Sequence, residues 1–135
     1  LNPLKLYLTL GVSYIASGIS SKVKNLSELM YSAMVHPGFS IVHVQSPCTT
    51  YHNTYEQLKG NVKKGIAPLA WQVEEGHDPS DIKSAQASIE KGGIPLGTLY
   101  QDSNRPTFGE RIESITEKSK SKSTKDLLDT HAIIL

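Results

Sequence analysis

The chain has 135 residues, about one domain's length, with 38% hydrophobic residues, 20% charged residues and a formal net charge of +1. This balance gives no general argument for a nucleic-acid or acidic partner, and no apolar run approaches the roughly 18 residues of a transmembrane helix. No signal-peptide pattern opens the chain, and its one cysteine, Cys48, cannot form an internal disulfide. We therefore expect a cytoplasmic protein with neither a membrane nor a nucleic-acid partner.

The first segment is expected to be a helix. Asn2-Pro3 has the form of an N-cap followed by proline at the first helical position. Small and apolar residues then recur at three- and four-residue intervals, at Leu4, Leu8, Gly11, Ile15 and Gly18. The pattern predicts one amphipathic helix, with Gly11 allowing close packing and Gly18 ending it, followed by a polar linker over residues 17–24. Leu1, in place of Met and directly at this cap, favours a piece of a longer protein over a trimmed chain.

A second helix and a strand follow. Asn25 with Glu28 three residues on predicts a capping box, and residues 36–38 (His-Pro-Gly) end the helix. The segment over residues 39–44 is too continuously apolar for a strand with one wet face, so we expect both faces to be covered. The helix is expected to bury one apolar face, with its two methionines as core filler: Leu26, Leu29, Met30, Ala33 and Met34.

A helix followed by a buried strand is typical of a parallel sheet, which makes the predicted fold class α/β. Cys48 then lies just beyond the strand's carboxyl end, where open α/β sheets bind their ligands. Asn53, with Glu56 three residues later, predicts the cap of a third helix ended by Gly65. The buried edge of this helix is expected to be Tyr55, Leu58 and Val62.

The remaining chain alternates strands and helices. Residues 66–73 are expected to be extended, Asp78-Pro79 to be a second cap with proline at the first helical position, and residues 94–100 to be a short strand. A turn over residues 102–106 precedes a last helix. The Lys/Ser-rich residues 116–125 are expected to be mobile, and residues 132–135 either dock on a partner or are disordered. The two later helices are predicted from the apolar faces that they carry, which are Ile82, Ala85 and Ile89, and Phe108, Ile112 and Ile115.

Four interpretations of Cys48 stay open at this point. A lone cysteine is often a small buried hydrophobe. A zinc site with His43 and His52 is a second possibility, although no C-x-x-C partner exists. The third is a nucleophile with His52 or His77 as base and Asn53 as orienter. The fourth is one ligand of an iron–sulfur cluster whose other cysteines lie outside this chain. His36 and His77 are otherwise expected to be structural, and no phosphate-binding glycine motif is present.

Several segments together resemble a known family. Residues 36–44 (HPGFSIVHV) followed by 46–51 (SPCTTY) resemble the beta subunit of 2-oxoacid:ferredoxin oxidoreductases, thiamine-diphosphate enzymes that oxidise pyruvate or 2-oxoglutarate to acyl-CoA. The likeness covers about residues 2–112. It departs from the family at His52, which intervenes before Asn53, so no role is carried over for Asn53. The flanking segments that also agree are Asn2-Pro3, 77–81 (HDPSD), Ala85, 95–100 (PLGTLY) and 105–108 (RPTF).

The resemblance implies one cofactor-binding and metal-ligating residue, Cys48, as one of four thiolates of a 4Fe-4S cluster that passes electrons to ferredoxin. Thr49, Thr50 and their backbone amides would supply donors, and Pro47 would stiffen the loop. Thiamine diphosphate and magnesium belong to a motif absent from this chain, so the chain alone is predicted to be inactive. The implied partners are an alpha (or alpha/gamma) subunit, ferredoxin, coenzyme A and a 2-oxoacid.

The resemblance also implies three parts: residues 1–46 as the end of the thiamine-diphosphate α/β domain, 47–112 as a C-terminal extension and 113–135 as a polar tail. A second hypothesis keeps the same fold without catalysis. In that case the chain is an α/β interaction module, or an inactive truncated remnant, that docks on a partner subunit.

Overall fold

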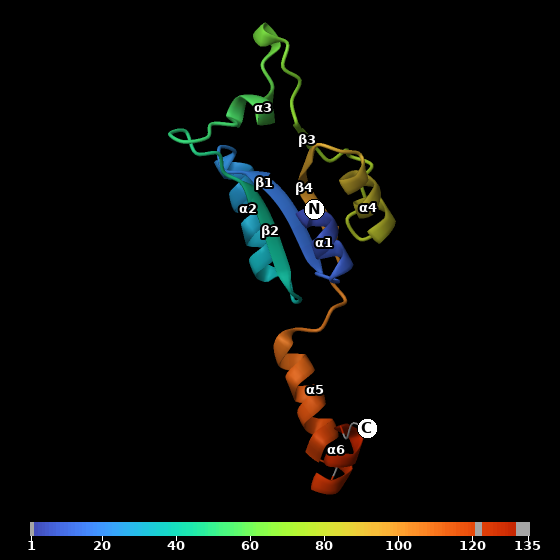
Figure 1. Cartoon of the computed structure of the whole chain (residues 1–135). Helices are drawn as coiled ribbons and strands as arrows, with labels where there is room; N and C mark the ends of the chain where they lie inside the picture. Colours follow the sequence, from blue (N-terminus) through green and yellow to red (C-terminus); the bar gives the residue numbers. More distant parts are fainter. Residues whose placement is uncertain (1, 121–122, 132–135) are drawn as a thin grey trace. The chain divides into compact units, whose positions relative to one another are not determined.

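The computed structural model describes residues 2–120 and 123–131 (Figure 1). The chain divides into two compact units, residues 1–105 and 106–135. The first unit contains a four-stranded sheet with its helices, and the second contains two helices. The elements in chain order are α1 (Pro3–Thr9), β1 (Tyr14–Ile19), α2 (Val23–Val35), β2 (Ser40–Gln45), α3 (Tyr55–Lys59), the 3-10 helix η1 (Val62–Lys64), β3 (Ala70–Gln72), α4 (Ile82–Glu90), β4 (Ile94–Gln101), α5 (Phe108–Lys120) and α6 (Thr124–His131).

The sheet has the strand order β2-β1-β4-β3 and mixes both pairing directions. β1 pairs with β2 in parallel, from Tyr14 opposite Ser40 to Ile19 opposite Gln45. β4 is antiparallel to β1 and parallel to β3. The α/β fold class is therefore confirmed, while the expectation of a parallel sheet holds only for two of the three strand pairs. The segment over residues 66–73 contributes β3 and so belongs to this sheet.

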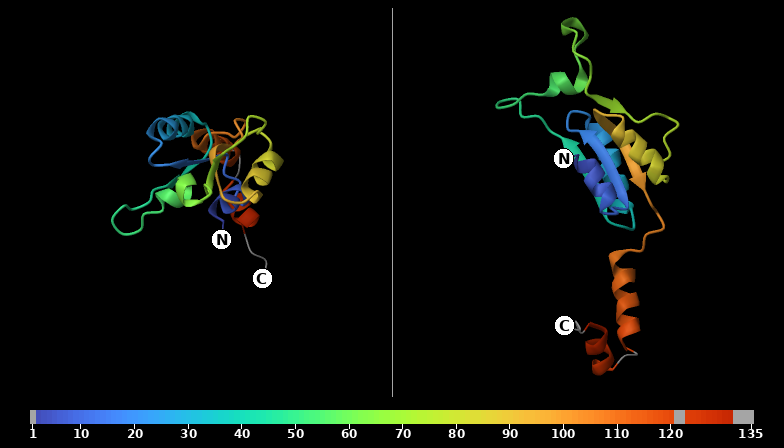
Figure 2. Two further views of the ribbon diagram at one scale, coloured as in Figure 1. Left: turned by 90° about the horizontal axis from the view of Figure 1, so that it is seen from above. Right: turned by 45° about the vertical axis from the view of Figure 1, so that its right-hand side comes forward.

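Helices cover both faces of the sheet (Figure 2). The Tyr14 hydroxyl donates to the Leu29 carbonyl of α2, whereas the next residue, Ile15, packs with residues of α1 and α4. Successive strand side chains point to opposite faces, so α2 lies on the face opposite α1 and α4. The main core on the α1 side is Leu4, Val12, Ile15, Ile89 and Leu99, and a smaller core near α3 is Ile19, Leu58 and Leu96.

The predicted first helix is wrong beyond its first turns. Asn2 caps α1 as expected, accepting from the backbone N–H of Leu4 at 3.0 Å. The helix ends at Thr9 because Gly11 adopts φ of 73°, a left-handed conformation typical of a helix C-terminus. Tyr14–Ile19, expected to be helix and linker, is instead the fully buried strand β1. Gly18 does not end a helix; a Cβ there would lie 3.2 Å from Leu26 Cδ1 of α2, so it allows that helix to pack closely.

Helix α2 and strand β2 form where expected but are more exposed than expected. α2 begins at Val23 without a side-chain cap, not at Asn25. Met30 and Met34 are 50% and 83% exposed and so are not core filler. β2 is an edge strand of intermediate burial, and the preceding Phe39 is 69% exposed. The expectation of a strand covered on both faces is wrong for the residues described.

The later elements need smaller corrections. α3 stops at Lys59, before Gly60 with φ of 76°, and Val62 of η1 is 98% exposed instead of buried. The cap of α4 is Asp81, which accepts from two backbone N–H groups of the first helical turn, and not Asp78-Pro79. β4, the turn over 102–106 and α5 are confirmed as elements. The apolar residues of α5 are nevertheless exposed, Phe108 by 79%, Ile112 by 45% and Ile115 by 58%.

The expected mobility of the Lys/Ser-rich segment stays a prediction, and its described residues are mostly in helices. α5 continues through residues 116–120 and α6 begins at Thr124, so the described part of the Lys/Ser segment is mostly helical. Residues 121–122 and 132–135 lie outside the described residues. The three-part division at residues 46 and 112 stays a prediction, and strands from both sides of residue 46 share one sheet.

Candidate functional site

Cys48 lies in a short loop three residues beyond β2. The thiol is free and exposed, so the interpretation as a buried hydrophobe is wrong. Residues 48–52 form a closed turn in which the backbone N–H of His52 donates to the Cys48 carbonyl at 3.0 Å. The expected position, at the carboxyl end of a strand parallel to its neighbour, is confirmed. Ligands of open α/β sheets bind at such a strand end.

The backbone of the turn favours the charged form of the thiol. The N–H groups of Tyr51 and Thr50, and less strongly that of His52, lower the pKa of the Cys48 thiol below its ordinary value. Hydrogen bonds to the charged form favour it, so the loop favours a thiolate. The sequence suggested Thr49 and Thr50 as donors; Thr50 fits this expectation, whereas Tyr51 and His52 were missed because nothing in a side chain marks a backbone donor.

The geometry gives no support to the zinc interpretation, to His77 as a base for Cys48 or to Asn53 as its orienter, whereas His52 as the base stays a prediction. Within residues 2–120 and 123–131, no three His, Cys, Asp or Glu side chains lie close enough to hold a metal ion. The ring of His77 is bonded to residues of α4 and β4 instead of Cys48. Asn53 accepts from the backbone N–H of Tyr55 at 3.1 Å, which makes it a local helix-start residue.

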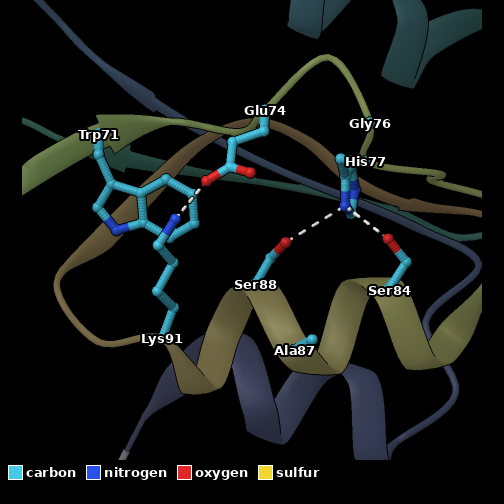
Figure 3. Close-up of a pocket in the computed structure, with 8 residues that line it drawn as sticks. All are labelled: Trp71, Glu74, Gly76, His77, Ser84, Ala87, Ser88 and Lys91. Carbon is cyan, nitrogen blue, oxygen red and sulfur yellow. Dashed lines mark hydrogen bonds and ion pairs between the residues drawn. The ribbon is translucent and has the colours of Figure 1, made fainter.

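A second polar cluster lines a cavity of about 280 Å³ between α4 and the segment that follows β3 (Figure 3). His77 Nε2 donates to the Leu99 carbonyl at 2.9 Å, so in the neutral ring Nδ1 accepts, with the Ser84 and Ser88 hydroxyls 3.0 and 3.2 Å away. The lining residues are Trp71, Glu74, Gly76, His77, Ser84, Ala87, Ser88 and Lys91.

In the other half of this cavity, Lys91 interacts with an aromatic ring and with a carboxylate. The Lys91 ammonium lies 4.7 Å from the centre of the Trp71 ring and pairs with Glu74, as Figure 3 shows. This pairing lowers the pKa of the Glu74 carboxyl, first through the hydrogen bond from Lys91 and then through its charge. The Trp71 indole N–H donates to the Gly92 carbonyl at 2.8 Å.

The side chains in each half of the cavity interact with one another and connect separate segments of the chain. His77 links the loop after β3 to α4 and β4, which confirms its expected structural role. The sequence carries a further signal for this cluster, because Ser84, Ser88 and Lys91 recur at four- and three-residue spacing on α4 and just after it. They form a stripe next to that of the buried residues Ala85 and Ile89, because consecutive residues of a helix lie about 100° apart.

Comparison with known proteins adds the family. The family model that describes the C-terminal region of the pyruvate ferredoxin oxidoreductase beta chain matches residues 48–117, just over half of this protein, and the match begins at Cys48. The chain belongs to this family. A beta subunit of 2-oxoacid:ferredoxin oxidoreductase from Sulfolobus sp. is 34% identical, in a match that covers 84% of this chain and 39% of that subunit.

Other members of the beta-subunit family agree. The beta subunit of 2-oxoacid:ferredoxin oxidoreductase 2 from Aeropyrum pernix is 32% identical over 85% of this chain and 40% of its own length. A solved 2-oxoglutarate:ferredoxin oxidoreductase from Magnetococcus marinus, with 2-oxoglutarate, coenzyme A and succinyl-CoA bound, has a TM-score of 0.72 and 28% identity. That likeness covers 98% of this chain and 45% of the solved chain. The chain thus spans about two fifths of the curated relatives it matches.

Proposed function

We propose that this chain is the C-terminal part of a 2-oxoacid:ferredoxin oxidoreductase beta subunit and that Cys48 supplies one thiolate ligand of a 4Fe-4S cluster. The single observation that carries this proposal is the place of the free, exposed Cys48 thiol, in a closed turn just beyond the carboxyl end of a strand in a parallel pair and at the first residue of the family match. Fe–S clusters are bound by thiolates, and hydrogen bonds to the sulfur tune their potential.

Cys48 and its turn fit one of the four ligand positions of such a cluster. The turn closed by the His52 N–H holds the sulfur at the surface, and Pro47 restricts the backbone before it. When bound, a 4Fe-4S cluster supplies one-electron acceptance during the oxidation of a 2-oxoacid to acyl-CoA. The three other thiolates, and the residues for thiamine diphosphate and magnesium, would come from sequence outside this chain.

The proposed whole enzyme is cytoplasmic, passes electrons to ferredoxin and uses coenzyme A, with an alpha or alpha/gamma subunit as partner. The 135-residue chain by itself is predicted to be inactive, because one cysteine is a quarter of the ligand set. Among the helices of the described residues, none has the length and apolar character that a membrane span requires.

A chimeric subunit tests the proposal. The region of the Sulfolobus sp. beta subunit that this chain matches is replaced by the chain, and 2-oxoacid- and coenzyme A-dependent reduction of ferredoxin is measured anaerobically with the alpha subunit. We expect activity with the original chain, its loss with Cys48→Ala, and its retention with Tyr51→Phe, because the Tyr51 side chain is 91% exposed. Full activity with Cys48→Ala would favour the non-catalytic interaction module.

A further inference from the structure

The cavity between α4 and the segment after β3 contains one hydroxyl proton that its own walls do not use. Ser84 Oγ accepts from the backbone N–H of Asp78 at 3.1 Å and lies 3.0 Å from His77 Nδ1. Because Nδ1 of a neutral histidine has one lone pair, the Ser84 hydroxyl donates to it and both of its roles are filled. Ser88 Oγ lies farther from the same nitrogen, at 3.2 Å, and this is its one hydrogen-bond partner within residues 2–120 and 123–131. The Ser88 hydroxyl can therefore donate its proton to a ligand.

The end of the cavity opposite His77 is an aromatic ring whose orientation is fixed (Figure 3). The indole N–H of Trp71 donates to the Gly92 carbonyl at 2.8 Å. The chain also packs against one edge of the ring, since a Cβ at Gly93 would lie 3.3 Å from Cδ1 and Nε1 of Trp71. A ring held in this way offers its face for stacking without losing rotamer freedom when a ligand binds.

The Lys91 side chain that lies over this ring is held only weakly. Its ammonium is 4.7 Å from the ring centre and pairs with Glu74. The side chains of Lys91 and Glu74 are 55% and 72% exposed. Exposed ion pairs and exposed cation–π contacts both contribute little to stability. Lys91 can therefore move off the Trp71 ring at small cost when a flat ligand stacks there.

The charges and the size of the cavity favour a small neutral ligand. Its walls carry one positive and one negative side chain, Lys91 and Glu74, which pair with each other. Ser88 lies in the last turn of α4, and the carbonyl end of a helix disfavours an anion such as phosphate or a carboxylate. The volume of about 280 Å³ lies below the roughly 300–1,000 Å³ of pockets for drug-sized ligands. Gly76 and Ala87 line this space without filling it, so a single ring system fits.

We propose that this cavity binds a neutral, planar heteroaromatic ring of nucleobase size. The ring stacks on Trp71 in place of the Lys91 ammonium, and a nitrogen or carbonyl oxygen at its edge accepts from the Ser88 hydroxyl. Neither Cys48 nor its turn lines the cavity, so the inference is independent of the proposed function.

Nucleoside binding to the whole chain tests the proposal. Equilibrium dialysis with adenosine, guanosine, cytidine and uridine measures the binding. The fluorescence of Trp71, the one tryptophan of the sequence, locates it at the cavity. We expect saturable binding of at least one nucleoside, with a change of fluorescence that has the same midpoint. Absence of saturable binding by all four nucleosides, or binding that leaves the fluorescence unchanged, would overturn the proposal.

Matched variants test the hydrogen bond and the cavity. Ser88→Ala should weaken the binding about two- to tenfold, because one hydrogen bond to the ligand is lost. Ser27→Ala is the control, since Ser27 is an exposed serine of α2 on the other face of the sheet, and we expect unchanged affinity. Equal affinity of the two variants would overturn the role of Ser88. If Ser88→Ala loses the circular dichroism of the folded chain, Ala87→Leu replaces it. That variant fills the cavity from an exposed position and should abolish binding, and unchanged affinity would place the ligand elsewhere.

The Lys91→Ala variant separates a neutral ligand from an anion. We expect equal or tighter nucleoside binding, because the ligand no longer displaces the ammonium from the ring. Loss of binding in Lys91→Ala, or competition by inorganic phosphate, would show an anion site and overturn the proposal. Cys48→Ser should bind nucleosides with unchanged affinity. Failure of nucleoside binding would refute this inference alone, whereas failure of cluster assembly would refute the role of Cys48 alone.

Discussion

Gly38 offers the sharpest test of the packing beneath β2. A Cβ at this position would lie 2.1 Å from Ser13 Oγ and 2.9 Å from His36 Nε2. The Ser13 hydroxyl donates to the Phe39 carbonyl and accepts from His36 Nε2, each at 3.0 Å. Ser13 and His36 are only 3% and 8% exposed, so neither can turn to solvent. Gly38→Ala must therefore displace the hydroxyl and break both bonds.

The expected loss in the free energy of unfolding is about 2–4 kcal/mol. Two hydrogen bonds contribute roughly 0.5–1.5 kcal/mol each, and overpacking adds about 1–3 kcal/mol, part of which relaxation of the chain recovers. Urea denaturation followed by circular dichroism measures the change through the midpoint at constant m. Gly76→Ala is the control, because a Cβ there meets nothing within 4 Å, and we expect it to stay within about 0.5 kcal/mol of the original chain.

A double-mutant cycle can refute this reasoning. With Ser13→Ala the hydroxyl is gone, and the nearest remaining Ser13 atom is Cβ at 3.0 Å from the added methyl. The cost of Gly38→Ala should then fall by at least about 1 kcal/mol. An equal cost in both backgrounds would show that the Ser13 hydroxyl is not the obstacle.

Three further outcomes follow from the first unit. Asp81→Ala should lower the free energy of unfolding by about 0.5–2 kcal/mol and Asp78→Ala by less, because Asp81 caps α4. If urea denaturation showed a larger loss for Asp78→Ala, Asp78 would be the cap, as the sequence predicted. His77→Ala should cost about 1–3 kcal/mol, because the Leu99 carbonyl and Ser84 lose their partner, whereas Ser88→Ala should cost under about 1 kcal/mol; equal effects would contradict the geometry. Burial lowers the pKa of His36 in the folded chain below its ordinary value of 6.5, and the charge of Asp102 opposes this shift in part. The unfolded chain therefore binds the proton more readily than the folded chain. The free energy of unfolding is highest above pH 6.5 and decreases as the pH falls from 6.5 toward the pKa of His36 in the folded chain. Asp102→Asn should steepen this loss in pH-dependent denaturation, and an unchanged slope would contradict it.

The central strand shows where sequence reasoning fails. The spacing of Leu4, Leu8, Gly11 and Ile15 suits a helix, and Tyr14–Ile19 contains Ala, Ser and Gly, which favour no strand on their own. Burial on both sides by other strands and helices decides the conformation of this segment, and that is a tertiary effect. The available local signal was the glycine at position 11, because glycine readily adopts the left-handed conformation that ends α1 here.

The Cys48 loop shows the opposite case. Its place beyond a strand could be predicted, because the apolar run over residues 39–44 lies between Pro37-Gly38 and Ser46-Pro47. The backbone donors around the sulfur could not, since their direction depends on the closed turn from Cys48 to His52. The exposure of β2 was also missed, because an apolar run suggests burial without showing which strands and helices would cover it.

The most direct measurement of the central claim is the cluster content of the chimeric beta subunit after anaerobic reconstitution. Iron and acid-labile sulfide are determined per chain, and the reduced protein is examined by electron paramagnetic resonance. We expect a 4Fe-4S signal with the original chain and with Tyr51→Phe, and its loss or conversion with Cys48→Ala. An unchanged cluster content and spectrum with Cys48→Ala would contradict the assignment of Cys48 as a ligand.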